Sequence, residues 1–294
     1  MSRNMTRRLR RALLLTGGIA LALYASLVLA MFVMQRSLMY FPDHRFFQPD
    51  TPGVAIQVVR LATGDGERLV AWYLPPRDGK PIFLHLNGNG GGLYVQEGRW
   101  RRMADEGVGF LGIAWRGYGG STGHPTEEGL IQDAEAGYAF LASRFPSDRI
   151  VIQGYSLGTG PAVQLAARHP ARALILEAPY TSAMEVAERR YPLLPVSLLM
   201  EDRLMSRNWI GRVHMPVLIV HGERDHTIPF DMGQTLFRLA NPPKRFVAMP
   251  ESDHNTLVRD GLYLHVWRFL GLSDAPAAKI AVPAEPVAPR PRRL

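Results

Sequence analysis

The chain's clearest chemical signal is a serine between two glycines, Gly154-Tyr155-Ser156-Leu157-Gly158, directly after the apolar segment 150–153. A strand, a sharp turn and a helix in this order would place the Ser156 hydroxyl at the tip of the turn. The glycines relieve crowding there, because the turn is strained and the neighbouring elements pass close to it. The pattern predicts a nucleophilic serine, but it is short enough to occur by chance, so other residues must support it.

Partners for such a serine follow in the second half of the chain. Acyl transfer by serine needs a base for its proton and an acid that orients the base. Asp225 and His254 each follow a predicted strand, and Ser156, Asp225, His254 is one of the chain orders known for such triads. Asp253 is an alternative acid, but a residue adjacent to the histidine in sequence usually points elsewhere. We predict that His254 deprotonates Ser156 and that Asp225 orients His254.

A glycine-rich loop, 87–92, follows the apolar segment 81–86. Such loops can cradle phosphate, but this one lacks the third glycine of a dinucleotide fingerprint. The only Gly-Lys pair, Gly79-Lys80, precedes Pro81 rather than Ser or Thr, which excludes a P-loop. The loop can instead direct a backbone N–H toward the oxyanion that forms during acyl transfer. A flexible turn before the next helix is the alternative interpretation.

Segments typical of strands and helices alternate along most of the chain. A Thr-Gly-Asp-Gly turn at 63–66 predicts a hairpin between the first two strands. The predicted strands are 54–61, 69–74, 81–86, 108–115, 150–153, 173–176, 217–220 and 245–249. The predicted helices are 94–106, 127–144, 157–169, 230–240 and a final helix that ends near 270. The alternation predicts an α/β fold with a mostly parallel eight-stranded sheet flanked by helices.

The alternation breaks between residues 180 and 212. This segment is rich in Leu, Val, Met and Trp and has few strand signals. We interpret it as a small helical lid over the site. Its apolar side chains could line a pocket for an acyl chain or hold the lid to the domain, and the sequence leaves both open.

An uncharged apolar segment, 12–34, follows a basic N-terminus. As a helix it would reach about 34 Å at about 1.5 Å per residue, enough for a hydrocarbon core of about 30 Å. A cleaved signal peptide is the alternative, but its apolar core would normally span only about 7 to 15 residues. We therefore predict a retained, single-pass transmembrane helix. The arginines before it outnumber Arg36 and Arg45 after it, which predicts a cytoplasmic N-terminus and a domain on the opposite side, the periplasm in a bacterium.

The segment after the predicted anchor is interpreted as a linker. It contains Tyr40, Phe41, Phe46 and Phe47, which could lie at the membrane interface or pack against the first strand. The predicted division of the chain is a basic cytoplasmic segment 1–11, an anchor 12–34, a linker 35–53, a domain 54–272 with its lid at about 180–212, and a disordered tail 273–294, rich in Pro and Ala.

The formal charge of +8 is concentrated at the two ends of the chain. Five arginines lie in 1–11 and a net charge of +2 in 273–294, so the part between is nearly neutral and nucleic-acid binding is not supported. The chain has no cysteine, which excludes disulfides, a thiol nucleophile and thiolate metal sites. No H-E-x-x-H or comparable spacing indicates a metal site, and the serine chemistry needs no cofactor. His85 lies inside a strand and His221 and His226 flank the acid, so we interpret them as structural or exposed.

Several motifs in order give the chain a specific resemblance. They are Arg116-Gly117-Tyr118-Gly119, the Pro-Thr-Glu-Glu-Gly-Leu run at 125–130, the serine motif at 154–158, Leu-Glu-Ala-Pro-Tyr-Thr-Ser at 176–182, the segment 221–229 that contains Asp225, and His254-Asn255. From about residue 50 to 270 the chain resembles the α/β-hydrolase superfamily, and more narrowly its branch of membrane-anchored α/β-hydrolase-domain proteins. One residue departs from that branch, because Asn87 stands where a histidine is usual.

The resemblance implies an α/β-hydrolase fold and hydrolysis of carboxylic esters or thioesters, often of acyl lipids or acylated proteins. It implies that the backbone N–H groups of Asn89 and Leu157 form the oxyanion hole. Small-molecule or lipid esters are the expected substrates. A serine peptidase of the same fold and a non-catalytic binding protein remain alternatives, because fold does not determine function. The sequence gives no oligomeric state.

Overall fold

An eight-stranded sheet forms the centre of the domain, in the order β10-β9-β8-β7-β4-β6-β3-β2. The computed structural model describes residues 3–272. β2 pairs antiparallel with β3, and β3 with β6, whereas all other neighbours in this sheet are parallel. The strands are β2 Gln57–Ala62, β3 Arg68–Leu74, β4 Ile82–Leu86, β6 Gly109–Ile113, β7 Ile150–Tyr155, β8 Ala173–Glu177, β9 Val217–Gly222 and β10 Lys244–Met249. The predicted mostly parallel eight-stranded sheet is confirmed.

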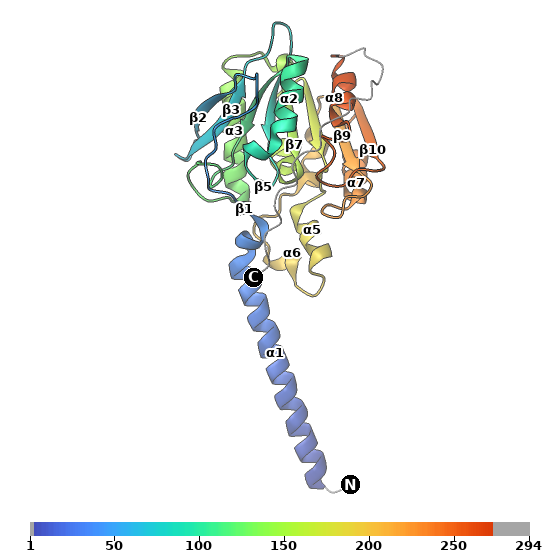
Figure 1. Ribbon diagram of the computed structural model, residues 1–294. Coiled ribbons are helices and arrows are strands. Elements are labelled where there is room, and N and C mark those ends of the chain that lie inside the picture. The colour runs from blue at the N-terminus through green and yellow to red at the C-terminus, as the bar shows by residue number, and fades with distance from the viewer. Residues whose placement is uncertain (1–2, 273–294) are drawn as a thin grey trace.

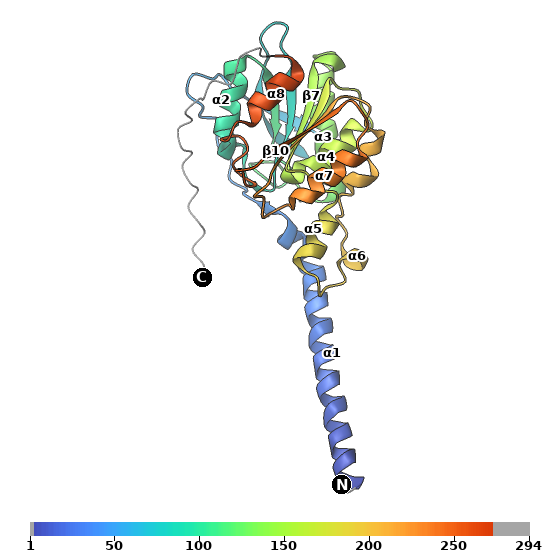
Figure 2. The same ribbon diagram turned by 90° about the vertical axis from the view of Figure 1, so that its right-hand side faces the viewer.

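Helices cover both faces of the sheet (Figure 1). Figure 2 shows α2 and α8 on one side and α3, α4 and α7 on the other. Every residue of β4, β6, β8 and β9 is buried, which explains why these strands read as continuous apolar segments. The helices are α2 Glu97–Glu106, α3 Glu127–Ala142, α4 Thr159–Ala166, α7 Phe230–Leu239 and α8 Leu262–Leu270. The predicted α/β class is therefore correct.

Local chemistry explains where the helices next to the serine begin. The Thr126 hydroxyl accepts a hydrogen bond from the Gly129 N–H at 3.0 Å and so caps α3, whose first turn carries two glutamates. The predicted helix 157–169 instead starts as a 3₁₀ turn, η3 Ser156–Gly158, and continues as α4 only to Ala166. Ser156 therefore lies in the tight turn directly after the end of β7.

The lid segment, defined as residues 180–212, contains short helices as predicted. They are α5 Ala183–Arg190, α6 Val196–Leu199, η4 Ser206–Asn208 and η5 Ile210–Arg212. In Figures 1 and 2, α5 and α6 lie on the side of the domain from which α1 projects, beside the C-terminal part of that helix.

One helix, α1 Arg3–Met39, contains the predicted anchor and continues beyond it. The predicted linker 35–53 is therefore helical at its start, and the side chains of Gln35 and Arg36 contact the lid segment there. Next, β1 Phe41–Pro42 pairs with β5 Gly90–Gly91 of the glycine-rich loop. Tyr40 is buried in the core, whereas Phe41, Phe46 and Phe47 are exposed. The predicted disordered tail 273–294 lies outside the described residues.

Candidate active site

Ser156 occupies a strained turn between β7 and η3. Its φ is +50°, in the left-handed region that residues with a side chain rarely adopt. A side chain at Gly154 would place its Cβ 2.6 Å from the Gly158 carbonyl oxygen, and one at Gly158 would collide with the Leu86 carbonyl oxygen. Glycine is required at both positions because the strand, the turn and the neighbouring loop approach one another closely. This geometry is the elbow that the sequence pattern predicts.

The structure brings Ser156, His254 and Asp225 together. His254 Nε2 lies 2.8 Å from Ser156 Oγ, and His254 Nδ1 lies 2.7 Å from Asp225 Oδ2. An ionised carboxylate can only accept, so Nδ1 carries the ring hydrogen and Nε2 accepts the serine hydroxyl proton. All three residues are buried, which shields these hydrogen bonds from competing water. The arrangement can transfer a proton from the serine to the imidazole.

Asp225 is held as a carboxylate by four donors. Its Oδ1 accepts the backbone N–H groups of Thr227 and Ile228, each at 2.8 Å, and His221 Nε2 lies 3.2 Å from Oδ2. Burial by itself would raise the pKa of Asp225, but hydrogen bonds from His221 and His254 hold this pKa well below its usual range. Asp225 therefore stays ionised and can stabilise a protonated His254.

His221 has a more specific position than the sequence suggested. It was expected to be structural or exposed, and it is completely buried, with Nε2 also 3.1 Å from the Ile228 carbonyl oxygen. Its spacing of four residues before Asp225, within one loop-forming motif, is the signal that could have identified it. His221 contacts the orienting acid and not Ser156.

The alternative acid, Asp253, points away from the imidazole. Its Oδ1 accepts the backbone N–H of Asn255 at 2.8 Å, and its own N–H donates to Thr256 Oγ1 at 3.0 Å. Asp253 thus stabilises the turn that carries His254. The geometry leaves Asp225 as the carboxylate that contacts this histidine.

Asn89 and Leu157, the predicted oxyanion residues, line the same pocket as Ser156. Leu157 lies in the first turn of η3, where backbone N–H groups have no partner within the helix. The Asn89 side chain fixes its loop, because Oδ1 accepts hydrogen bonds from Tyr118 Oη at 2.8 Å and from the Phe41 N–H at 3.1 Å. Both residues therefore lie at the pocket that contains Ser156, and the oxyanion role of their backbone N–H groups stays a prediction.

Asn87, the departure from the family pattern, is buried at the start of the glycine-rich loop. Its carbonyl oxygen accepts from Trp115 Nε1 at 2.9 Å and its Oδ1 accepts from Gln96 Nε2 at 3.1 Å. These contacts fix the loop from two sides. Asparagine at this position therefore supports an ordered loop.

A buried ion pair lies beneath the serine turn, and the sequence did not single it out as a pair. Arg99 on α2 forms two hydrogen bonds with Glu177 at the end of β8, at 2.7 and 2.8 Å, and both side chains are almost fully buried. The Arg99 guanidinium lies 5.7 Å from the centre of the Tyr155 ring. The Tyr155 hydroxyl in turn donates to the His254 carbonyl oxygen at 3.1 Å. The pair thus supports both the serine turn and the loop that carries the histidine.

An apolar pocket of about 320 Å³ opens at Ser156. Its walls come from α1, the loop at Asn89, the residues after β9 and the lid segment, whose contributing side chains are mainly Val, Leu, Ala and Pro. The lid segment therefore does line a pocket at the serine. Mostly apolar walls beside a reactive serine are suited to a substrate that has a hydrocarbon chain.

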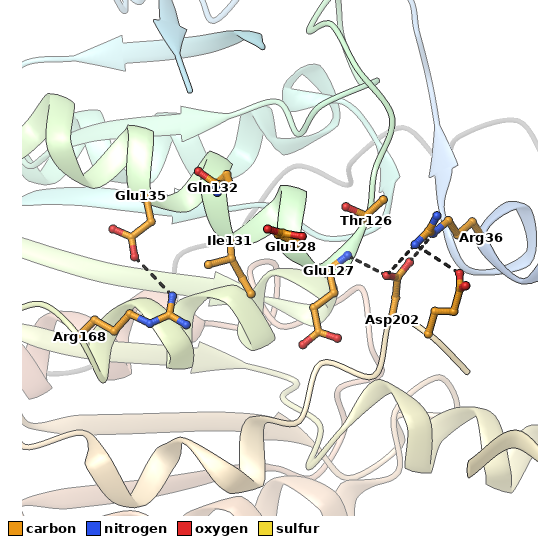
Figure 3. A pocket seen from close by; sticks show the side chains of 10 residues that line it. Arg36, Thr126, Glu127, Glu128, Ile131, Gln132, Glu135, Arg168 and Asp202 are labelled. Carbon is orange, nitrogen blue, oxygen red and sulfur yellow. Dashed lines mark hydrogen bonds and ion pairs between the residues drawn. The ribbon is translucent and has the colours of Figure 1, made fainter. Parts of the chain in front are cut away.

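A larger cavity, of about 810 Å³, lies away from the serine and is polar (Figure 3). Asp202 lies at one end of the cavity, next to Arg36, and its carboxylate accepts from Arg36 Nε at 3.0 Å and from the Glu127 N–H at 3.1 Å (Figure 3). These contacts join α1, the lid segment and the N-terminus of α3. Within residues 3–272 there is no group of three or more His, Asp or Glu side chains that could hold a metal ion.

Known proteins resemble the chain in both sequence and fold. A family model described as alpha/beta hydrolase fold matches residues 81–204. The uncharacterised protein Rv2307c of Mycobacterium tuberculosis is 37% identical over 241 residues, which cover 80% of this chain and 85% of that protein. Human protein ABHD12B is 32% identical over 217 residues, which cover 64% of this chain and 60% of that protein.

Among solved structures, an esterase of Pyrococcus furiosus, Pf2001, aligns with a TM-score of 0.64. The alignment covers 79% of this chain and 97% of the esterase at 19% identity, so it supports the fold alone. The match with Rv2307c is close and long enough to establish common ancestry, and the family model and the solved structure agree with it. The chain belongs to the α/β-hydrolase superfamily and has its fold.

Proposed function

We propose that the protein is a serine hydrolase that cleaves carboxylic ester or thioester bonds of acyl compounds through an acyl-enzyme on Ser156. The observation that carries this proposal is the hydrogen-bonded series Ser156, His254, Asp225, whose serine lines a mostly apolar pocket. The acyl chain would occupy the pocket, and the carbonyl carbon would lie at Ser156 Oγ.

The geometry supports a two-step reaction. In the first step Ser156 Oγ attacks the carbonyl carbon while His254 Nε2 takes the hydroxyl proton. The carbonyl electron pair moves to oxygen, and the backbone N–H groups of Asn89 and Leu157 stabilise the oxyanion. When the tetrahedral intermediate collapses, the C–O or C–S bond breaks and His254 returns the proton to the leaving alcohol or thiol.

Water resolves the acyl-enzyme in the second step. His254 Nε2 takes a proton from the water as its oxygen attacks the acyl carbon, and then returns that proton to Ser156 Oγ as the carboxylic acid leaves. Asp225 keeps the hydrogen on Nδ1 throughout and stabilises the imidazolium. The protein's own residues carry every proton transfer.

We also propose that α1 anchors the protein in a membrane. The helix segment Arg7–Met39 contains an 18-residue window with a mean hydropathy of 2.2, and it is long and apolar enough to cross a bilayer. The arginines before it favour a cytoplasmic N-terminus, with the hydrolase domain on the opposite side. A membrane fraction that retains the N-terminal peptide after carbonate extraction would support this, whereas a mature chain that begins after residue 30 would indicate a cleaved signal sequence.

The direct test is labelling of the purified protein with a fluorophosphonate probe, which reacts with activated serines. We expect labelling at Ser156 and none in a Ser156→Ala variant that keeps its thermal midpoint. Competition with acyl esters, thioesters and peptides then ranks the substrate classes. A folded sample that does not label would contradict the proposed enzyme and favour a binding protein.

A further inference from the structure

The helix α1 contributes one wall of the pocket at Ser156. The lining residues on it are Val28, Met31, Phe32, Gln35, Leu38 and Met39. They recur at intervals of three or four residues, so they form one face of the helix. The pocket wall is therefore a continuous stripe and not a single chance contact.

Polar contacts hold this face of α1 against the lid segment. The Tyr24 hydroxyl donates to the Leu193 carbonyl oxygen at 2.8 Å, and Gln35 Oε1 accepts from the Glu201 N–H at 2.9 Å. Arg36 forms an ion pair with Asp202 at 3.0 Å. These contacts lie toward the two ends of the lining stripe. The two walls of the groove between α1 and the lid segment are thus held together by specific polar contacts.

The surface around the outer end of this groove is apolar. Leu193 and Leu198, on the lid segment, are 84% and 78% exposed, and the apolar face of α1 continues beside them. Exposed apolar side chains in such a group are unfavourable in water but favourable in a bilayer. The lid tip would therefore enter the membrane together with α1.

We infer that α1 is part of the acyl-chain site, and that a long-chain acyl ester resident in the membrane enters laterally between α1 and the lid segment. The stripe from Val28 to Met39 extends about 16 Å at about 1.5 Å per residue, from the apolar part of α1 to the serine. An acyl chain in this groove would contact mostly apolar side chains, with Gln35 and Arg190 as polar members of the lining. The inference rests on the proposed function and adds to it a substrate class and a route.

The test fills the groove from the α1 side. Met31→Trp places a bulky ring in the groove, and Val33→Trp is the matched control, because Val33 is 73% exposed and does not line the pocket. Both changes keep α1 apolar. The full-length protein in phosphatidylcholine vesicles is assayed with p-nitrophenyl palmitate and p-nitrophenyl butyrate.

We expect Met31→Trp to lower the palmitate-to-butyrate ratio of kcat/KM about tenfold or more, the effect of about two buried CH₂ groups that lose their contacts. Val33→Trp should keep the wild-type ratio. Equal ratios for both variants would overturn the inference. If the folded wild-type protein does not react with the fluorophosphonate at all, the proposed function itself is refuted.

A binding measurement tests the route without catalysis. In the Ser156→Ala variant, a palmitoyl ester with a photoreactive chain should crosslink to α1 near Met31 and to the lid segment, and Met31→Trp should reduce this crosslinking. Crosslinks confined to other surfaces would overturn the proposed route.

Discussion

Replacement of Asp225 by asparagine tests the proposed acid most directly. In the wild type, Asp225 Oδ1 accepts two backbone N–H groups at 2.8 Å, while Oδ2 faces His254 Nδ1 at 2.7 Å and His221 Nε2 at 3.2 Å. Asparagine has only one oxygen, and the two backbone donors hold it at the Oδ1 position. Its NH₂ group then faces His254 Nδ1.

This change forces the wrong tautomer of His254. An amide that donates to Nδ1 leaves the ring hydrogen on Nε2, and an Nε2–H facing Ser156 Oγ at 2.8 Å cannot accept the hydroxyl proton. We expect kcat for p-nitrophenyl butyrate to fall about 10⁴-fold, a loss of about 5 kcal/mol of transition-state stabilisation. The neutral amide also cannot stabilise the imidazolium as the carboxylate does, and this loss lowers kcat further.

Asp253→Asn is the matched control. Its Oδ1 accepts only the Asn255 N–H, a contact that an amide oxygen can keep, and the residue is exposed. We expect kcat within about twofold of the wild type, in line with other surface substitutions. The assignment of the acid is wrong if Asp225→Asn, folded at the assay temperature, keeps more than about a tenth of the wild-type activity.

Three further changes probe the surroundings of the site. Glu177→Gln leaves the Arg99 charge buried without a carboxylate and should cost about 3 to 5 kcal/mol, measured as a lower urea midpoint, whereas adding Arg99→Met should restore most of it. Gly158→Ala drives a Cβ into two backbone carbonyls and should lower both kcat and the thermal midpoint, whereas Gly18→Ala, with open space around it, should change neither. The pKa of Asp225 is lower in the folded protein than its unfolded value of about 3.8. The ionised carboxylate therefore stabilises the fold above that unfolded pKa, and this contribution is lost as the pH falls through the folded-state pKa. Acidification below pH 4 should thus lower the thermal midpoint of the wild type more than that of Asp225→Asn. Equal decreases of the two thermal midpoints on acidification would contradict this linkage.

The sequence predicted the juxtaposition of Ser156, Asp225 and His254 because each residue follows a strand, and the carboxyl ends of parallel strands meet at one edge of the sheet. The pattern of apolar residues and the turn residues that follow it predict where each strand ends. The sheet order then brings together residues that are far apart in the chain. The fold and the contacts of the three side chains were therefore accessible from the sequence, while their catalytic roles remain predictions.

Contacts across the fold were not accessible in the same way. Arg99 and Glu177 are on different elements, and neither has a local pattern that marks it as buried, since most charged residues lie at the surface. His221 has a local signal, but its contact with Asp225 depends on the turn after β9. Such pairs are set by packing, so they become visible only when the strands have been placed.

The largest departure from the sequence prediction concerns α1. An apolar segment followed by a linker suggests an anchor that acts independently of the domain, and composition alone supports that interpretation. Gln35 and Arg36 interrupt the apolar segment, so a prediction from composition places its end at residue 34. In the structure α1 instead continues to Met39, Gln35 and Arg36 have partners in the lid segment, and the apolar face of the helix lies beside Ser156. If α1 also crosses a membrane, then the same side chains that hold the protein in the bilayer shape its substrate site, and changes of the anchor sequence should alter chain-length preference.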